Sequence, residues 1–109
     1  MRTIFTAVLC CLYSYSMQSQ EWHVYVFIAE DCPVCNYMGK PLQELAVKFQ
    51  SAVTFHAVFP LKYSNFKTTH IFKEKYGMLS FETILDKELA ITKKLGATVT
   101  PEAVITDEM

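Results

Sequence analysis

The chain has 109 residues, of which 51% are hydrophobic and 19% are charged, and its formal net charge is −1. This length predicts a single domain, and the composition favours a packed globule over a disordered chain. A nearly neutral chain without a basic stretch argues against a nucleic-acid-binding surface. It also argues against a basic helix that would bind an acidic membrane surface.

The first residues have the pattern of a secretory signal peptide. Arg2 is a short positive start, an apolar run extends over residues 4–13, and Ser14 and Ser16 supply small residues for cleavage after about Ser16. The sequence therefore predicts a signal peptide over residues 1–16 and a periplasmic or secreted protein. The apolar run is too short for a permanent anchor, so no stable membrane span is expected after signal removal.

Two alternatives for this segment stay open: a lipoprotein with Cys10 or Cys11 lipidated, and a buried N-terminal helix. If the segment is removed, the mature chain keeps only Cys32 and Cys35. An oxidising compartment permits disulfides, and two cysteines in CxxC spacing there indicate thiol chemistry.

The mature chain begins with a buried strand that runs into a helix. Residues 23–29, HVYVFIA, form an apolar and β-branched run, which is typical of a strand covered on both faces. Pro33 follows where a helix would start, and proline suits the first helical position because its missing N–H costs nothing there. Apolar residues then recur at steps of three and four, which predicts a helix with these residues in the core. They are Val34, Met38, Leu42, Leu45, Ala46 and Phe49.

The rest of the chain continues the alternation of strands and helices. The predicted elements are a strand over 53–59, a helix over 64–76, a strand over 81–85, a helix over 87–95 and a strand over 102–106. Gly77 would stop the second helix, while Asp86 and Gly96 are the expected N-cap and C-terminal residue of the third. Such alternation predicts an α/β layer fold with right-handed crossovers.

The two remaining cysteines lie where the first strand gives way to the first helix. Cys32 precedes the helix and Cys35 lies one turn later on the same side, so the two sulfurs can approach closely enough to bond. The helix N-terminus favours a thiolate at Cys32, which would attack a disulfide, while Cys35 would resolve the mixed disulfide. Asp31 adds a negative charge that opposes the thiolate, so the direction of electron flow is left open.

The same residues allow other interpretations. The cysteine pair could be an inert disulfide, or half of a zinc site, although there is no second CxxC and the histidines lack ligand spacing. No metal site is therefore expected. His23, His56 and His70 are interpreted as structural or surface residues. Pro101 either marks the entry of the last strand or is a cis-proline in a turn beside the cysteines.

Three segments carry a family resemblance. YVFIAEDCPVCNYM, VTFHAVFP and LDKELAITKKLGATVTPEAVITD resemble the thioredoxin-like redoxins, the group that includes the alkyl hydroperoxide reductase and thiol-specific antioxidant domain. The similarity spans roughly residues 23–107, and the domain is expected over 23–109. The resemblance implies a thioredoxin-like fold, a three-layer α/β/α arrangement with a central mixed sheet. Since that fold usually continues with one more strand and a helix, the chain is expected to lack the last strand and helix.

The resemblance also implies an activity and residue roles. Cys32 would be the nucleophile and Cys35 the resolving thiol, with Pro101 as the cis-proline and Thr100 beside the sulfurs for substrate binding. The expected function is that of an exported thiol–disulfide oxidoreductase that needs no cofactor. Its partners would be protein thiols and disulfides, including a redox partner that the sequence does not identify. The alternatives are a non-catalytic binding module with a structural disulfide, and a peroxidase-type antioxidant redoxin. Peroxiredoxins need a threonine where this chain has Ala29.

Overall fold

The structure is a computed structural model, and it describes residues 21–107. The predicted signal peptide over 1–16 lies outside the described residues. The elements alternate along the chain: β1 (Trp22–Phe27), α2 (Pro33–Lys48), β2 (Val53–Phe59), α3 (Phe66–Lys75), β3 (Glu82–Leu85), α4 (Ala90–Leu95) and β4 (Glu102–Thr106). Every predicted strand and helix of this part of the chain is present, with ends shifted by a few residues.

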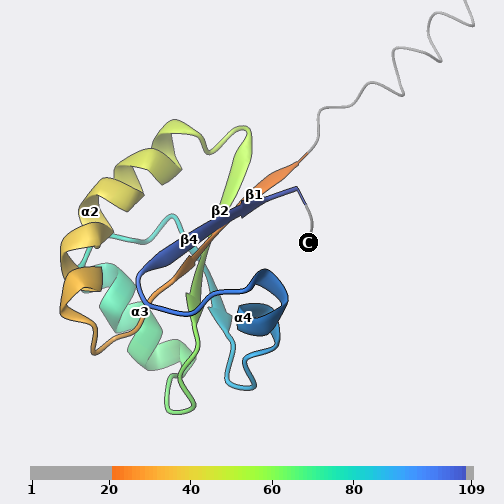
Figure 1. The fold of residues 1–109 in the computed structure, drawn as a ribbon. Coiled ribbons are helices and arrows are strands. Elements are labelled where there is room, and N and C mark those ends of the chain that lie inside the picture. The colour runs from red at the N-terminus through yellow and green to blue at the C-terminus, as the bar shows by residue number, and fades with distance from the viewer. Residues whose placement is uncertain (1–20, 108–109) are drawn as a thin grey trace, which may run out of the picture.

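The four strands form one mixed sheet in the order β3-β2-β1-β4. β1 pairs in parallel with β2, and β2 in parallel with β3, whereas β4 pairs antiparallel with β1. The parallel connections pass through α2 and α3, as expected when strands alternate with helices. In Figure 1, α2 and α3 lie on one side of the sheet and α4 lies on the other. The observed architecture is the predicted three-layer α/β/α arrangement with a central mixed sheet.

Each face of the sheet has its own hydrophobic core because side chains alternate along a strand. The core beneath α2 and α3 is the larger one, and its largest buried members are Ile28, Phe59, Phe72, Met78 and Phe81. The core beneath α4 is built from Tyr25, Phe27 and Val58, with Ile84, Ile91, Leu95, Ala97 and Val104 packed against it. β1 is buried from both sides, which confirms the prediction from its continuous apolar run.

The predicted core stripe of α2 is wrong in part. The fully buried residues of the helix are Cys35, Gly39 and Ala46, and Leu42 is partly buried. Val34, Met38, Leu45 and Phe49 are exposed. The buried line carries small residues because the helix lies close to the segment after α3: a Cβ on Gly39 would come within 2.5 Å of the Tyr76 carbonyl oxygen. Close packing, and not hydrophobicity alone, therefore determines which face of α2 is buried.

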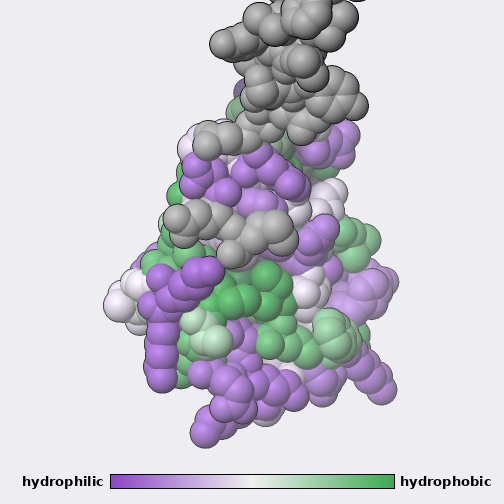
Figure 2. Space-filling model, turned by 90° about the vertical axis from the view of Figure 1, so that its right-hand side faces the viewer, coloured by the Kyte–Doolittle hydropathy of each residue, from purple (hydrophilic) through white to green (hydrophobic). Residues whose placement is uncertain are grey.

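The start of α4 also differs from the prediction. The N-cap is Leu89, in a left-handed conformation with φ of 62°, and not Asp86. Asp86 still serves the helix, because its carboxylate accepts hydrogen bonds from the amides of Ile91 (3.1 Å) and Thr92 (2.7 Å). Two extra turn residues separate this acceptor from the helix that it stabilises. Gly96 ends α4 in the left-handed conformation, as predicted. Viewed from the α4 side, Figure 2 shows hydrophobic side chains gathered at the height of this helix with hydrophilic ones around them.

Candidate functional site at the start of helix α2

The cysteine pair, Cys32 and Cys35, lies at the junction that the sequence predicts. Cys32 is the N-cap residue of α2 in an extended conformation, and Pro33 occupies the first helical position. The turn before the helix is closed by the Cys32 amide, which donates to the Ala29 carbonyl at 3.2 Å. One turn into the helix, Cys35 is completely buried in the larger core, whereas Cys32 is half-buried at its edge. Only one of the two sulfurs is therefore open to a partner.

The two cysteines are free thiols that approach each other to 2.8 Å. A sulfur–sulfur bond is about 2.05 Å long, so a small movement is enough to join them. The pair can therefore pass between a dithiol and a disulfide without rearrangement of the fold.

The environment of Cys32 favours its thiolate. Burial is the largest single influence, and it raises the pKa. Hydrogen bonding from the Cys35 side chain and amide, from the Thr100 side chain and from the Val34 amide acts in the opposite direction and leaves the pKa of Cys32 lowered. No capping hydrogen bond of strict geometry forms to the Cys32 side chain, so the two amides act as nearby dipoles at the helix N-terminus. The lowered pKa has the direction that the sequence predicts.

The environment of Cys35 has the opposite effect. Burial raises its pKa most, and the neighbouring Cys32 side chain raises it further, to about 12. A nearby thiolate repels a second negative charge, so the pair loses its first proton far more easily than its second. The two thiols therefore differ: Cys32 loses its proton more readily, and Cys35 keeps its proton to a higher pH.

The segment before β4 lies against the cysteine pair. Thr100 and Pro101 are joined by a cis peptide bond, the geometry that the family resemblance implies and one of the two alternatives left open for Pro101. The Cys32 Sγ lies 3.6 Å from the Thr100 carbonyl oxygen across 68 residues of sequence. All four residues singled out from the sequence, Cys32, Cys35, Thr100 and Pro101, thus belong to one site.

The acidic residues before Cys32 are held by the loop after β2. Tyr63 donates its hydroxyl to the Asp31 carboxylate at 2.9 Å, and Ser64 donates a short hydrogen bond to Glu30. Ser64 is completely buried, whereas Asp31 and Tyr63 are exposed. The hydrogen bond to Asp31 raises the pKa of Tyr63. Sequence reasoning did not find these partners, because they are polar loop residues more than thirty positions away from the acids that they bind.

Among residues 21–107, no three His, Cys, Asp or Glu side chains are grouped so that they could bind a metal ion. Within the same part of the chain, no helix is both long and apolar enough to cross a membrane.

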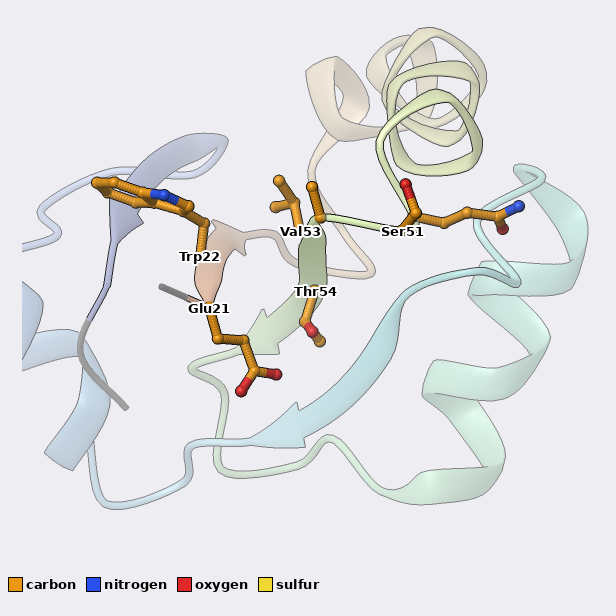
Figure 3. A pocket seen from close by; sticks show the side chains of 7 residues that line it. Glu21, Trp22, Ser51, Val53 and Thr54 are labelled. Carbon is orange, nitrogen blue, oxygen red and sulfur yellow. The ribbon is translucent and has the colours of Figure 1, made fainter. Parts of the chain in front are cut away.

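Two cavities differ in their relation to the site. One of about 630 Å³ lies at the N-terminal ends of β1 and β2, far from either cysteine, and Figure 3 shows Glu21 and Thr54 on one side of it and Trp22 and Val53 on the other. A second of about 280 Å³ reaches Thr100 itself. Its lining residues are Phe27, Pro60, Leu89, Thr92, Ala97, Thr98, Val99 and Thr100. The smaller cavity is the one that a molecule bound at Cys32 could enter.

Comparison with known proteins places the fold. No protein-family model and no curated protein sequence matches the chain. Among solved structures, it resembles DsbF of MTB, with a TM-score of 0.70 and 23% identity over 80% of this chain and 63% of that one. It also resembles a secreted Mycobacterium tuberculosis disulfide oxidoreductase homologous to E. coli DsbE, with a TM-score of 0.65 and 20% identity over 87% of this chain and 74% of that one.

A third similar structure is a thioredoxin-like protein from Aeropyrum pernix, with a TM-score of 0.66 and 20% identity over 84% of this chain and 66% of that one. The chain spans less than two thirds of the length of DsbF. At these identities the likeness establishes architecture. The chain has a thioredoxin-like fold, as the sequence predicts.

Proposed function

We propose that this protein is a thiol–disulfide oxidoreductase that exchanges disulfides with other proteins through Cys32 and Cys35. The observation that carries the proposal is the unequal placement of the two sulfurs. Cys32 is half-buried with a lowered pKa, and Cys35 is buried with a pKa raised to about 12. A structural disulfide needs no such difference, whereas exchange requires one attacking thiolate and one protected thiol.

The reaction begins at Cys32. Its thiolate attacks one sulfur of a substrate disulfide, the substrate S–S bond breaks, and the second substrate sulfur leaves as a thiolate that takes a proton from solvent. Cys35 then loses its proton to solvent and attacks the Cys32 sulfur of the mixed disulfide. The substrate leaves as a dithiol reduced by two electrons, and the cysteine pair is oxidised to a disulfide. The reverse sequence oxidises a substrate dithiol.

Thr100 and Pro101 are proposed to bind the substrate. The Thr100 carbonyl oxygen lies 3.6 Å from the Cys32 sulfur, Pro101 follows Thr100 in the chain, and the smaller cavity is lined in part by Thr100. A substrate chain that reaches Cys32 would therefore lie along this segment. No bound cofactor is needed, because the electrons pass directly between sulfur atoms.

The substrates are proposed to be protein thiols and disulfides, with a dedicated redox partner that restores the cysteine pair. We place the protein in the periplasm or outside the cell, on the signal-peptide pattern of residues 1–16 and on the likeness to a structure described as a secreted disulfide oxidoreductase. Residues 23–109 are proposed as the functional domain. Two finer expectations stay predictions from the sequence: membership of the alkyl hydroperoxide reductase type, and lack of the last strand and helix.

A trapping experiment tests the proposal. Cys35→Ser removes the resolving thiol, so the variant should accumulate mixed disulfides with its substrates. These would appear as higher-mass species on non-reducing gels that vanish with reductant. Cys32→Ser should trap nothing and should lose exchange with a model protein disulfide. The double variant controls for adventitious thiols.

Two results would overturn the assignment. If Cys35→Ser traps nothing and keeps full exchange activity, the roles given to the two sulfurs are wrong. If Cys32 is unreactive towards an alkylating probe near neutral pH, the cysteine pair is a structural clamp in a binding module. Hydrogen peroxide turnover that survives Cys35→Ser would replace the proposal with the peroxidase alternative.

A further inference from the structure

A second pair of titratable side chains lies at the opposite end of the sheet. His23 in β1 and His56 in β2 are only 3% and 8% exposed. The Nδ1 atom of His23 and the Nε2 atom of His56 are 2.9 Å apart, across 33 residues of sequence. We call these two residues the histidine pair. β1 runs from His23 towards Cys32, so thiol–disulfide exchange at Cys32 makes no use of this pair.

The second ring nitrogen of His56 has no hydrogen-bond partner among the described residues. This atom, Nδ1, is buried, and the nearest carboxylate oxygen, Oε2 of Glu82 in β3, is 3.4 Å away. The ring is stacked on Tyr25, with ring centres 4.6 Å apart and planes 12° from parallel. The histidine pair thus bridges β1 and β2, and Glu82 extends the contact to β3.

The contact between the His23 and His56 rings can hold only a limited number of protons. Two neutral imidazoles carry two N–H groups on four nitrogens, so one ring donates to the other. One added proton leaves one nitrogen free, which can still accept the hydrogen bond between the rings. A second added proton puts an N–H on all four nitrogens. Two donors and two positive charges then face each other at 2.9 Å, and the contact is lost whichever tautomers were present before.

We propose that the histidine pair is an acid-sensitive link between β1 and β2, which holds the N-terminal ends of these strands together while it carries at most one added proton. Below that limit the strands stay joined by the ring contact. Beyond it, the two imidazolium rings repel each other, and the sheet opens from this end. The proposal is independent of the redox activity, because it depends on β1, β2 and β3 alone.

The charged groups around His56 act in both directions. Glu82 of β3 and Glu21 before β1 favour its protonated form, and His23 disfavours it. Burial lowers the pKa of Lys73 in α3, and the Glu82 carboxylate opposes that lowering, so Glu82 acts on Lys73 as well as on His56. α4 packs on the same face of the sheet with Lys93 and Lys94 as its charged residues, and β4 brings Thr106 opposite His23 with Asp107 next to it. Burial remains the largest influence and lowers the pKa of His56.

The sign of the pH effect follows from that lowering. The unfolded chain binds a proton on histidine at about pH 6.5, and the folded chain binds it only at a lower pH. Stability is therefore complete above pH 6.5 and falls as the pH drops below it. For one histidine held neutral, the folding equilibrium constant should fall about ten- to thirty-fold between pH 7.5 and pH 5.

The test compares denaturation of the full chain at several pH values with two variants. His56→Gln keeps a side chain that hydrogen-bonds but does not titrate, so the loss between pH 7.5 and pH 5 should shrink by about ten-fold or more. His70→Gln is the matched control, because His70 is an exposed histidine of α3 paired with Glu74 and should leave the loss unchanged. Trp22, the only tryptophan, adjoins His23 and reports opening of this end by fluorescence.

Two further measurements on the unaltered protein keep the proposal testable if His56→Gln does not fold. Titration of the histidine ring protons by NMR should show His56 titrating below the usual histidine value of about 6.5. Amide hydrogen exchange, corrected for its intrinsic pH dependence, should speed up in β1 and β2 on acidification before it does elsewhere. The proposal is overturned if His56→Gln keeps the full loss of stability on acidification, or if His56 titrates at or above the usual value of about 6.5.

Discussion

The two ends of the central sheet each bring together a pair of titratable side chains, but they bury them differently. At the end where β1 leads into α2, Cys32 is half-buried and Cys35 is completely buried. At the other end, His23 and His56 are both buried. Unequal burial separates the pKa values of the two cysteines, and the proposed roles of the two sulfurs depend on this difference. His23 and His56 are both buried, so burial does not distinguish one ring from the other. For this pair the number of protons that the contact between the rings can hold determines whether the contact survives.

The two pairs differ because one lies at the start of a helix and the other lies within two paired strands. The cysteine pair lies outside the strands, at the first turn of a helix, where free amides and a half-open edge favour an anion. The histidine pair lies within the strands, where backbone amides are used by the ladder and cannot serve a side chain. The same fold can therefore stabilise a charge at one end and exclude charge at the other.

The largest expected effect is the difference in reactivity between the two sulfurs. With the pKa of Cys35 at about 12 and that of Cys32 lowered, the two lie about three pH units or more apart, a thousand-fold in thiolate at pH 7. The higher pKa makes a thiolate intrinsically more nucleophilic and offsets about thirty-fold of this. Limited iodoacetamide labelling at pH 7, followed by peptide mapping, should therefore find Cys32 modified about thirty times more often than Cys35.

Equal labelling of Cys32 and Cys35 would contradict this prediction. In that case the burial of Cys35 would not protect it, and the two ends of the sheet would not differ in the way described. Labelling in denaturant supplies the control, because the two cysteines should then react at similar rates.

The sequence predicts the scaffold of this site well, for reasons that are local. The apolar run of β1 and Pro33 at the helix start are short-range signals, and they place Cys32 correctly at the N-cap. The position of Thr100 beside Cys32 is not local, since the two are 68 residues apart. Only the family resemblance of the segment around Pro101 led to it.

What sequence reasoning missed depends on packing. The buried face of α2 could not be found from hydrophobicity, because Gly39 and Ala46 are buried for their small size. The contact between His23 and His56 requires the register of β1 against β2, in which His56 pairs with Tyr25. An alternating strand pattern gives the facing direction of each residue but not its partner on the next strand.

A smaller effect on stability is expected from Asp86, a buried carboxylate whose stabilising contribution depends on pH in a different range from that of the histidine pair. Asp86 is buried, and burial alone would raise its pKa, but hydrogen bonds from Thr92, Ile91 and Ala90 leave it lowered. Asp86→Ala should cost about 1–2 kcal/mol of unfolding free energy at pH 7, as expected for lost helix caps. Glu88→Ala, an exposed acid in the same turn, should change it by less than about 0.5 kcal/mol.

The pH dependence of this cost has its own window. Since the folded pKa of Asp86 is lowered, its contribution is complete above the unfolded value of about 3.9 and disappears as the pH falls below it. The difference between wild type and Asp86→Ala should therefore stay constant from pH 7 to pH 5, where the histidine effect develops, and shrink only below about pH 4. Denaturation curves over pH 3–7 measure both windows, and a difference that shrinks already between pH 7 and pH 5 would contradict the assignment.

The smallest effect is expected from the acid next to the reactive sulfur. Asp31 immediately precedes Cys32, yet it is exposed and accepts a hydrogen bond from Tyr63. Its charge is not among the causes of the lowered pKa of Cys32, which come from burial, Cys35, Thr100 and Val34. Because solvent screens an exposed charge, Asp31→Asn should move the pH midpoint of Cys32 alkylation downward by less than about half a pH unit. Glu88→Gln is the matched control and should not move it. A shift of a full pH unit would mean that the Asp31 charge acts on the Cys32 sulfur despite its exposure to solvent, and solvent screening would not explain the small influence assigned to it.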